Sequence, residues 1–184
     1  GQGLLLGNGS DEIIQILAMA LAKPGARLMA FDPGFVMYKL IAELVGMEYV
    51  GVPLTPEDFS LDLEQALLAI RKYQPELIFI AYPNNPTGNA FDPMVIDAII
   101  EEAEGLVVID EAYQPFAEDT FMSRLGRHTN VMVMRTVSKL GLAGLRLGFL
   151  AGAPQWIEEL NKIRLPYNIN VLTQASATFA LQHA

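Results

Sequence analysis

Apolar residues three or four positions apart mark three segments of the chain. They are Met37, Leu40, Ile41, Leu44 and Val45 in the first segment, Ile96, Ile99, Ile100 and Ala103 in the second, and Trp156, Ile157, Leu160 and Ile163 in the third. This is the period of a helix that buries one face. We therefore predict three amphipathic helices, each packed on a core.

Short continuous apolar runs lie between these segments. The strongest runs are Leu77–Tyr82, Leu106–Ile109 and Val131–Met134, and weaker ones are Arg27–Phe31, Glu48–Val52 and Leu147–Ala151. Such runs are typical of strands buried on both faces of a parallel sheet. Strands that alternate with helices predict an α/β sandwich, in which ligands bind where the carboxyl ends of strands meet loops.

Two helix starts are marked by their residue types. Ser10 precedes Asp11, Glu12 and an apolar run, and Asp92-Pro93 precedes the helix over 94–103. Serine and aspartate are common caps, and proline suits the first helical position. The stretch from Thr55 to Ser60 reads as a surface connection.

Composition narrows the class of protein. The chain has 184 residues, 52% of them hydrophobic, which suits one domain, residues 1–184. Its 12 basic and 21 acidic residues give a net charge of −9, which disfavours nucleic acid as a partner.

With no cysteine and only two distant histidines, a thiolate or histidine metal site is not expected. The apolar run Ile16–Ala22 is too short for a membrane span, so we expect a soluble cytoplasmic protein.

Four short motifs carry candidate chemistry. In chain order they are Gly7-Asn8-Gly9-Ser10-Asp11-Glu12, Tyr82-Pro83-Asn84-Asn85-Pro86-Thr87-Gly88, Asp110-Glu111-Ala112-Tyr113, and Thr136-Val137-Ser138-Lys139 with Arg146 seven residues later. Each alone has an ordinary reading. The glycines and prolines suit turns, the acid suits a helix cap, and the lysine and arginine suit a solvated surface.

Together, in this order, the motifs resemble the fold-type I pyridoxal-phosphate aminotransferases. The resemblance is closest to the histidinol-phosphate aminotransferases, because the Gly-Asn-Gly-Ser-Asp-Glu opening, the Leu142–Gly148 segment and Pro166-Tyr167-Asn168 also match that group. It implies a three-layer α/β/α sandwich with a mostly parallel, mixed sheet, pyridoxal 5′-phosphate as cofactor, and transamination between L-histidinol phosphate and 2-oxoglutarate in histidine biosynthesis.

The same resemblance implies a role for each site residue. Lys139 attaches the cofactor as a Schiff base and moves the substrate proton, and Asp110 pairs with the pyridine nitrogen. Tyr113 and Asn85 donate hydrogen bonds to the 3′ oxygen of the cofactor.

Five further residues complete the implied cofactor site. The backbone N–H groups of Ser10 and Asp11, together with Ser138 and Arg146, hold the phosphate at a helix N-terminus. Phe35 stacks on the pyridine ring, against the alternative that it is an ordinary core aromatic.

The resemblance also implies that the chain is the large cofactor-binding domain of a longer, homodimeric enzyme. An N-terminal segment and a C-terminal small domain would then supply further substrate contacts, so the amino donor stays open. Alternatives are an aromatic aminotransferase or threonine-phosphate decarboxylase of the same fold, the ligand-sensing domain of a transcription regulator, and an inactive structural homologue. No basic helix-turn-helix pattern is present in the sequence.

Overall fold

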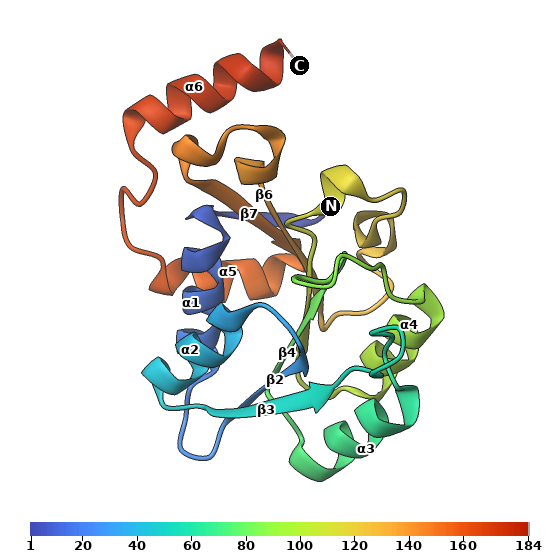
Figure 1. Ribbon diagram of the computed structural model, residues 1–184. Coiled ribbons are helices and arrows are strands. Elements are labelled where there is room, and N and C mark those ends of the chain that lie inside the picture. The colour runs from blue at the N-terminus through green and yellow to red at the C-terminus, as the bar shows by residue number, and fades with distance from the viewer. Residues whose placement is uncertain (184) are drawn as a thin grey trace.

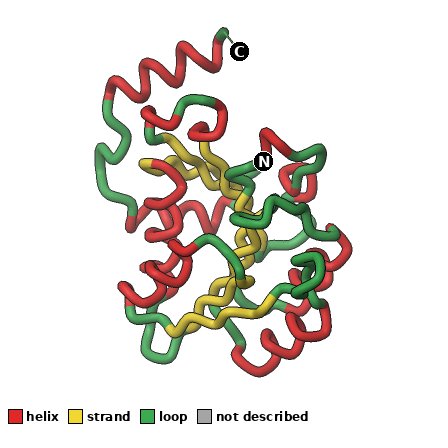
Figure 2. The backbone as a smooth tube through the Cα atoms, in the orientation of Figure 1, coloured by secondary structure: helices red, strands yellow, loops and turns green. Residues whose placement is uncertain are grey.

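A seven-stranded sheet lies between two layers of helices in the computed structural model, which describes residues 1–183 (Figure 1). The strands are β1 (Gly3–Asn8), β2 (Arg27–Asp32), β3 (Glu48–Pro53), β4 (Leu77–Ala81), β5 (Leu106–Asp110), β6 (Val131–Thr136) and β7 (Leu147–Gly152). The helices are α1 (Gly9–Leu21), α2 (Val36–Val45), α3 (Leu63–Tyr73), α4 (Pro93–Glu102), α5 (Pro154–Ile163) and α6 (Val171–Gln182). Figure 2 shows the strands running through the middle of the molecule.

The strand order in the sheet is β1-β7-β6-β5-β4-β2-β3. The strands β3, β2, β4, β5 and β6 are parallel, whereas β7 is antiparallel to both β6 and β1. The predicted mostly parallel, mixed sheet in a three-layer α/β/α sandwich is therefore confirmed. All six predicted strands are present within two residues at either end.

Alternate side chains of the central strands pack into two separate cores, one on each face of the sheet. Leu77 and Phe79 on β4 point to a core formed with α1, α2 and α5, and Ile78 and Ile80 point to a core formed with α3 and α4. Because both faces of β4 and β5 are covered, every residue of these strands is buried. This double coverage is why the two strands read as continuous apolar runs.

The start of α1 differs from the prediction. The helix begins at Gly9, so Ser10 is in the first turn and is not the residue before the helix. Asn8 occupies the cap position, but its side chain makes no capping hydrogen bond to the helix, and its backbone N–H donates to the Glu12 carboxylate at 2.6 Å. The Asp92 cap is confirmed, because its side chain accepts from the N–H of Met94 at 2.8 Å.

Two helices and one strand were not predicted. They are β1 at the sheet edge, α3, and α6, which extends from the body near the C-terminus (Figure 1). Among residues 1–183, no helix combines the length and the apolar character that a membrane crossing requires.

Candidate active site

A pocket opens where the carboxyl ends of β4, β5 and β6 approach the N-terminus of α1. It encloses about 750 Å³, including space open to solvent. All nine predicted site residues line it, namely Ser10, Asp11, Phe35, Asn85, Asp110, Tyr113, Ser138, Lys139 and Arg146. The structure thus brings together residues up to 136 positions apart, while their chemical roles stay predictions.

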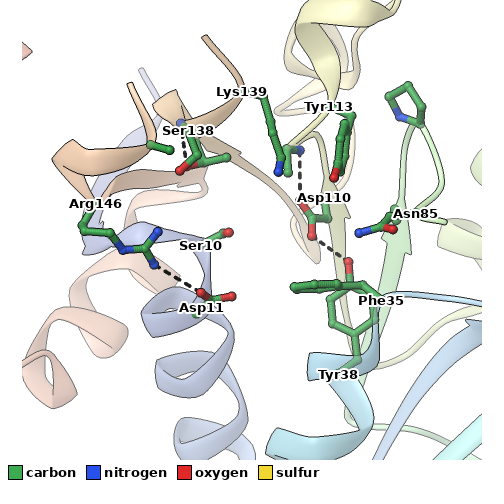
Figure 3. Close-up of a pocket in the computed structure, with 15 residues that line it drawn as sticks. Ser10, Asp11, Phe35, Tyr38, Asn85, Asp110, Tyr113, Ser138, Lys139 and Arg146 are labelled. Carbon is green, nitrogen blue, oxygen red and sulfur yellow. Dashed lines mark hydrogen bonds and ion pairs between the residues drawn. The ribbon is translucent and has the colours of Figure 1, made fainter. Parts of the chain in front are cut away.

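One end of the pocket holds an ion pair beside the first turn of α1. Arg146 reaches the first turn of α1, where its Nη2 atom lies 3.2 Å from Oδ2 of Asp11 (Figure 3). Ser10 lines the same end, and Ser138 faces it from the segment after β6 (Figure 3). A guanidinium beside a helix N-terminus favours a bound anion.

Two glycines allow this close packing. Gly9 has a φ of +78°, and a Cβ atom added there would lie 2.6 Å from Nη2 of Arg146. A Cβ atom on Gly148 would lie 2.9 Å from both the carbonyl carbon of Gly9 and the backbone nitrogen of Ser10. Side chains at either position would occupy the space that the arginine and the first helical turn now share.

Lys139 lies between the two ends of the pocket. It belongs to a short 3-10 turn, Val137–Leu140, that follows β6, and the Thr136 side chain caps this turn by accepting from the N–H of Ser138 at 3.2 Å. The lysine side chain points into the pocket (Figure 3). Its Nζ atom is 4.7 Å from the centre of the Tyr113 ring, which places the amine against an aromatic face.

Asp110 lies at the other end, as the last residue of β5, and is buried. Its Oδ2 atom accepts from the Tyr38 hydroxyl at 2.6 Å, and its Oδ1 atom accepts from the N–H of Ala112 at 3.0 Å. Burial raises the pKa of Asp110 from 3.8 to about 6, whereas these two hydrogen bonds act to lower the pKa. A cation placed against this carboxyl group would favour its ionised form.

Tyr38 is one of six pocket residues that the sequence interpretation did not name as site residues, and its hydroxyl contacts Asp110. It is almost fully buried, its ring stacks on Phe79 with centroids 4.6 Å apart, and Phe35 contacts it edge-on at 5.5 Å. Burial and the neighbouring Asp110 hold the pKa of its hydroxyl well above the usual value, so the hydroxyl stays a hydrogen-bond donor. A tyrosine inside an apolar helical pattern gave no sign of this polar contact.

The loop that carries Asn85 is organised by its neighbour Asn84, which is buried. The Asn84 amide donates to the Pro33 carbonyl at 3.1 Å and to the Thr87 hydroxyl at 2.7 Å. These bonds hold the loop beside the segment that leads to Phe35. The Asn85 side chain is consequently left facing the pocket (Figure 3).

An ion pair anchors the segment that carries Tyr113. The Glu111 side chain is fully buried and accepts from Nε of Arg135 at 2.8 Å, from the Thr120 hydroxyl, and from the N–H of Phe121 at 2.6 Å. Arg135 also donates to Thr120 at 2.8 Å. The network ties residues 111–121 to β6, and it therefore fixes the position of Tyr113 relative to Lys139.

The Pro166-Tyr167-Asn168 motif lies outside the pocket. The Asn168 side chain donates to the Glu12 carboxylate at 2.7 Å and to the Leu6 carbonyl at 3.1 Å, and it accepts from Nη1 of Arg164 at 2.8 Å. Tyr167 is exposed. The motif thus secures the chain that follows α5 to the start of α1.

Comparisons with known proteins identify close relatives. A family model described as aminotransferase class I and II matches residues 2–184. Histidinol-phosphate aminotransferase 2 of Cupriavidus pinatubonensis is 58% identical over 188 residues, covering 100% of this chain and 51% of that protein. Histidinol-phosphate aminotransferase of Chromobacterium violaceum is 58% identical over 181 residues, covering 98% and 51%. The chain therefore spans about half the length of these relatives.

Solved structures show the same fold. The structure of histidinol-phosphate aminotransferase from Sinorhizobium meliloti in complex with pyridoxal-5′-phosphate superimposes with a TM-score of 0.81 at 26% identity. The match covers 91% of this chain and 46% of that one.

Proposed function

Since the chain belongs to the aminotransferase class I and II family, whose cofactor is pyridoxal 5′-phosphate, we propose that the Lys139 pocket binds this cofactor. We further propose that the full-length protein is a histidinol-phosphate aminotransferase. It would exchange an amino group between L-histidinol phosphate and 2-oxoglutarate, giving imidazole acetol phosphate and glutamate. The observation that carries the proposal is the position of the Lys139 amine, in one cavity between the Arg146 guanidinium and the buried Asp110 carboxyl group.

The charges of the pocket match those of the cofactor. Arg146 and the first turn of α1 suit the phosphate, and the Asp110 carboxyl at the other end suits a protonated pyridine nitrogen. Gly9 and Gly148 leave the space at the phosphate end that side chains would fill. When bound, the cofactor supplies an electron sink for the negative charge that develops at the substrate α-carbon.

Lys139 would attach the cofactor and act as the general base and acid. Its amine would take the proton from the substrate α-carbon and would return it to the neighbouring carbon on the cofactor side. The side chain points into the pocket without a carboxylate partner among the described residues (Figure 3). It is therefore not held away from the substrate by an ion pair.

Asp110, Tyr113 and Asn85 would set the electronic state of the cofactor ring. A carboxylate fixed at the pyridine nitrogen keeps that nitrogen protonated and able to take up charge. The Tyr113 hydroxyl and the Asn85 amide would donate to the 3′ oxygen. Both side chains face the pocket from the Asp110 side, which agrees with these roles (Figure 3).

The phosphate would be held by Ser10, Asp11, Ser138 and Arg146, and Phe35 would stack on the ring. Arg146 has a left-handed backbone with a φ of +48°, a conformation that costs an L-residue about 1–2 kcal/mol. This conformation accompanies the direction of the guanidinium toward α1. The contact of Phe35 with Tyr38 would brace the stacking ring from behind.

The proposed partners are a phosphorylated amino donor, 2-oxoglutarate and a second copy of the protein. Enzymes of this fold share an active site between two subunits, which supports a homodimer, and relatives from bacterial histidine biosynthesis support a cytoplasmic location. Sedimentation analysis of the full-length protein should give a dimer. A fully active monomer would contradict this part of the proposal.

A substrate panel on the full-length protein tests the proposed reaction. Histidinol phosphate, phenylalanine, tyrosine and phosphothreonine are compared with 2-oxoglutarate as acceptor, and carbon dioxide release is measured beside glutamate formation. We expect the highest kcat/KM for histidinol phosphate and no activity in Lys139→Ala. Equal values across the panel would reject the substrate, and carbon dioxide release from phosphothreonine would indicate a decarboxylase.

A further inference from the structure

The Asp110 carboxyl group is held by one donor from outside its own segment, the hydroxyl of Tyr38. The two residues are 72 positions apart, and the O···O distance is 2.6 Å. The only other hydrogen bond to the Asp110 carboxyl group among the described residues comes from the N–H of Ala112. In the sheet, Asp110 pairs with Ala81 on β4 and Met134 on β6, neither of which offers a polar side chain.

The packing of the Tyr38 ring holds this hydroxyl in a fixed position. Its ring is stacked on Phe79 with an interplanar angle of 6°, and Phe35 closes the other side edge-on. The exposed fraction of Tyr38 is 2%, so water does not compete for the hydroxyl. A buried hydroxyl without an acceptor is costly, and Asp110 is the acceptor that this one has.

We propose that Tyr38 is a positioning residue for the reaction, which orients the Asp110 carboxylate toward the pyridine nitrogen and keeps it ionised. The inference rests on the proposed function, because it concerns the contact between Asp110 and the cofactor. Tyr38 donates to Oδ2 and Ala112 to Oδ1, so each oxygen is restrained by one donor. The carboxyl plane is therefore fixed before the cofactor binds.

The charges around Asp110 act against its ionised form, and the hydrogen bond from Tyr38 opposes them. Asp11 on α1 and the adjacent Glu111 raise the pKa of Asp110, in addition to the larger effect of burial. Lys139 lines the same pocket, and its attachment to the cofactor would remove its ammonium charge. Tyr38 and the N–H of Ala112 favour the carboxylate whether or not the cofactor is attached, and the effect of Tyr38 is the larger of the two.

Tyr38→Phe tests the inference, since it removes the hydroxyl and keeps the stacking ring. In the full-length apoprotein, the titration of Asp110 is followed by isotope-edited infrared spectroscopy with ¹³C-aspartate, and the Asp110 signal is assigned by its loss in Asp110→Asn. Loss of a hydrogen bond to a charged group should raise the pKa of Asp110 by about 1–2 units. Site-specific 3-fluorotyrosine at position 38, a stronger donor, should shift the pKa downward.

Tyr49→Phe is the matched control. The Tyr49 hydroxyl donates to Asp32 at 3.0 Å outside the pocket, so its removal breaks a Tyr–Asp bond of the same kind. The Asp110 signal should titrate in Tyr49→Phe as it does in the unmodified protein. An unchanged titration in both position-38 variants would overturn the inference.

The cofactor-loaded protein separates this inference from the proposed function. Tyr38→Phe should weaken cofactor affinity at neutral pH and lower kcat about tenfold, with a smaller effect on KM. A pKa shift in the apoprotein without changes in affinity and kcat would overturn the role toward the cofactor. Failure of the unmodified protein to bind pyridoxal phosphate at Lys139 would instead refute the proposed function, while the apoprotein titration would still report the contact between Tyr38 and Asp110.

Discussion

Opposing effects act on the pKa of the Asp110 carboxyl group. Burial favours the protonated form, whereas the proposed contact with the pyridine nitrogen requires the carboxylate. Hydrogen bonds from Tyr38 and Ala112 offset part of the burial effect, and the resulting pKa of about 6 lies close to neutrality. Binding of a cationic ring would complete the ionisation.

Replacing Asp110 by asparagine should impair chemistry more than binding. The side chain keeps its size but loses the charge that would stabilise the protonated pyridine nitrogen. We expect kcat to fall on the order of 100- to 1,000-fold, by analogy with the loss of one electrostatic contact in an active site. Steady-state kinetics and cofactor titration measure both effects, with Asp97→Asn as control, because Asp97 pairs with Arg124 outside the pocket. An unchanged kcat would contradict the role of Asp110.

The same substitution should alter the pH dependence of stability in the apoprotein. Because the pKa of Asp110 is raised from 3.8 to about 6 by folding, its contribution to stability is present below pH 3.8 and is lost as the pH rises through about 6. A shift of about two pKa units corresponds to about 3 kcal/mol. Urea denaturation across this range should show the unmodified protein losing that much relative to Asp110→Asn. Parallel pH profiles would contradict the raised pKa.

At the residue level, the sequence was sufficient to locate nine pocket residues but not Tyr38. Eight of them belong to the four short motifs, whose order along the chain indicates the family, and Phe35 was implied by the family resemblance. Tyr38 lies in an amphipathic helix, next to Met37 and three residues before Ile41, a position typical of a core residue. Its acceptor is 72 residues away, and no local pattern records a contact at that separation.

At the level of elements, the proposed phosphate end of the pocket depends on how α1 packs against β7 and Arg146. Gly9 starts α1 in a left-handed conformation, and Gly148 on β7 allows the first helical turn to approach. The first N–H groups of the helix are thereby directed at the same space as the guanidinium. The proposed phosphate site therefore depends on this junction more than on any one side chain.

Gly9→Ala should therefore weaken cofactor binding by disturbing the proposed phosphate end of the pocket. The added Cβ would lie 2.6 Å from Nη2 of Arg146 and would require a φ of +78°, so we expect stability to fall by about 1–2 kcal/mol and cofactor affinity to fall at least tenfold.

Gly46→Ala is the matched control for Gly9→Ala. Gly46 has a φ of +81° at the end of α2, and nothing lies within 4 Å of its added Cβ. Gly46→Ala should lose stability as Gly9→Ala does, which thermal unfolding measures. Its affinity for the cofactor should stay normal, which fluorescence titration measures. Equal affinities in the two variants would contradict the assigned phosphate position.

The elements differ in how clearly the sequence marks them. Strands β4 and β5 are buried on both faces and appear as unbroken apolar runs, whereas the edge strand β1 alternates between buried and exposed residues and was overlooked. Helix α6 has most of its large apolar side chains exposed, so its pattern is not amphipathic. Helix α3 carried a readable signal, the Asp62 cap before Leu63, Ala66 and Ile70.

At the scale of the whole molecule, the sheet assembles one site from segments that are distant in the chain. The phosphate end comes from α1 and from the segment after β6, and the acid end comes from β5 and α2. Alternation of strands and helices predicted the sandwich and the edge at which ligands bind. Strand order and the antiparallel placement of β7 depend on long-range pairing, which hydrophobic periodicity does not encode.

The central claim is that Lys139 carries the cofactor, and borohydride reduction of the cofactor-loaded full-length protein tests it most directly. Reduction makes the lysine–cofactor bond permanent, and peptide mass spectrometry then identifies the modified residue. We predict the label on Lys139 and, in Lys139→Ala, its absence from that peptide together with loss of transamination. Stoichiometric label on another residue, or retained activity in Lys139→Ala, would contradict the assignment of the site.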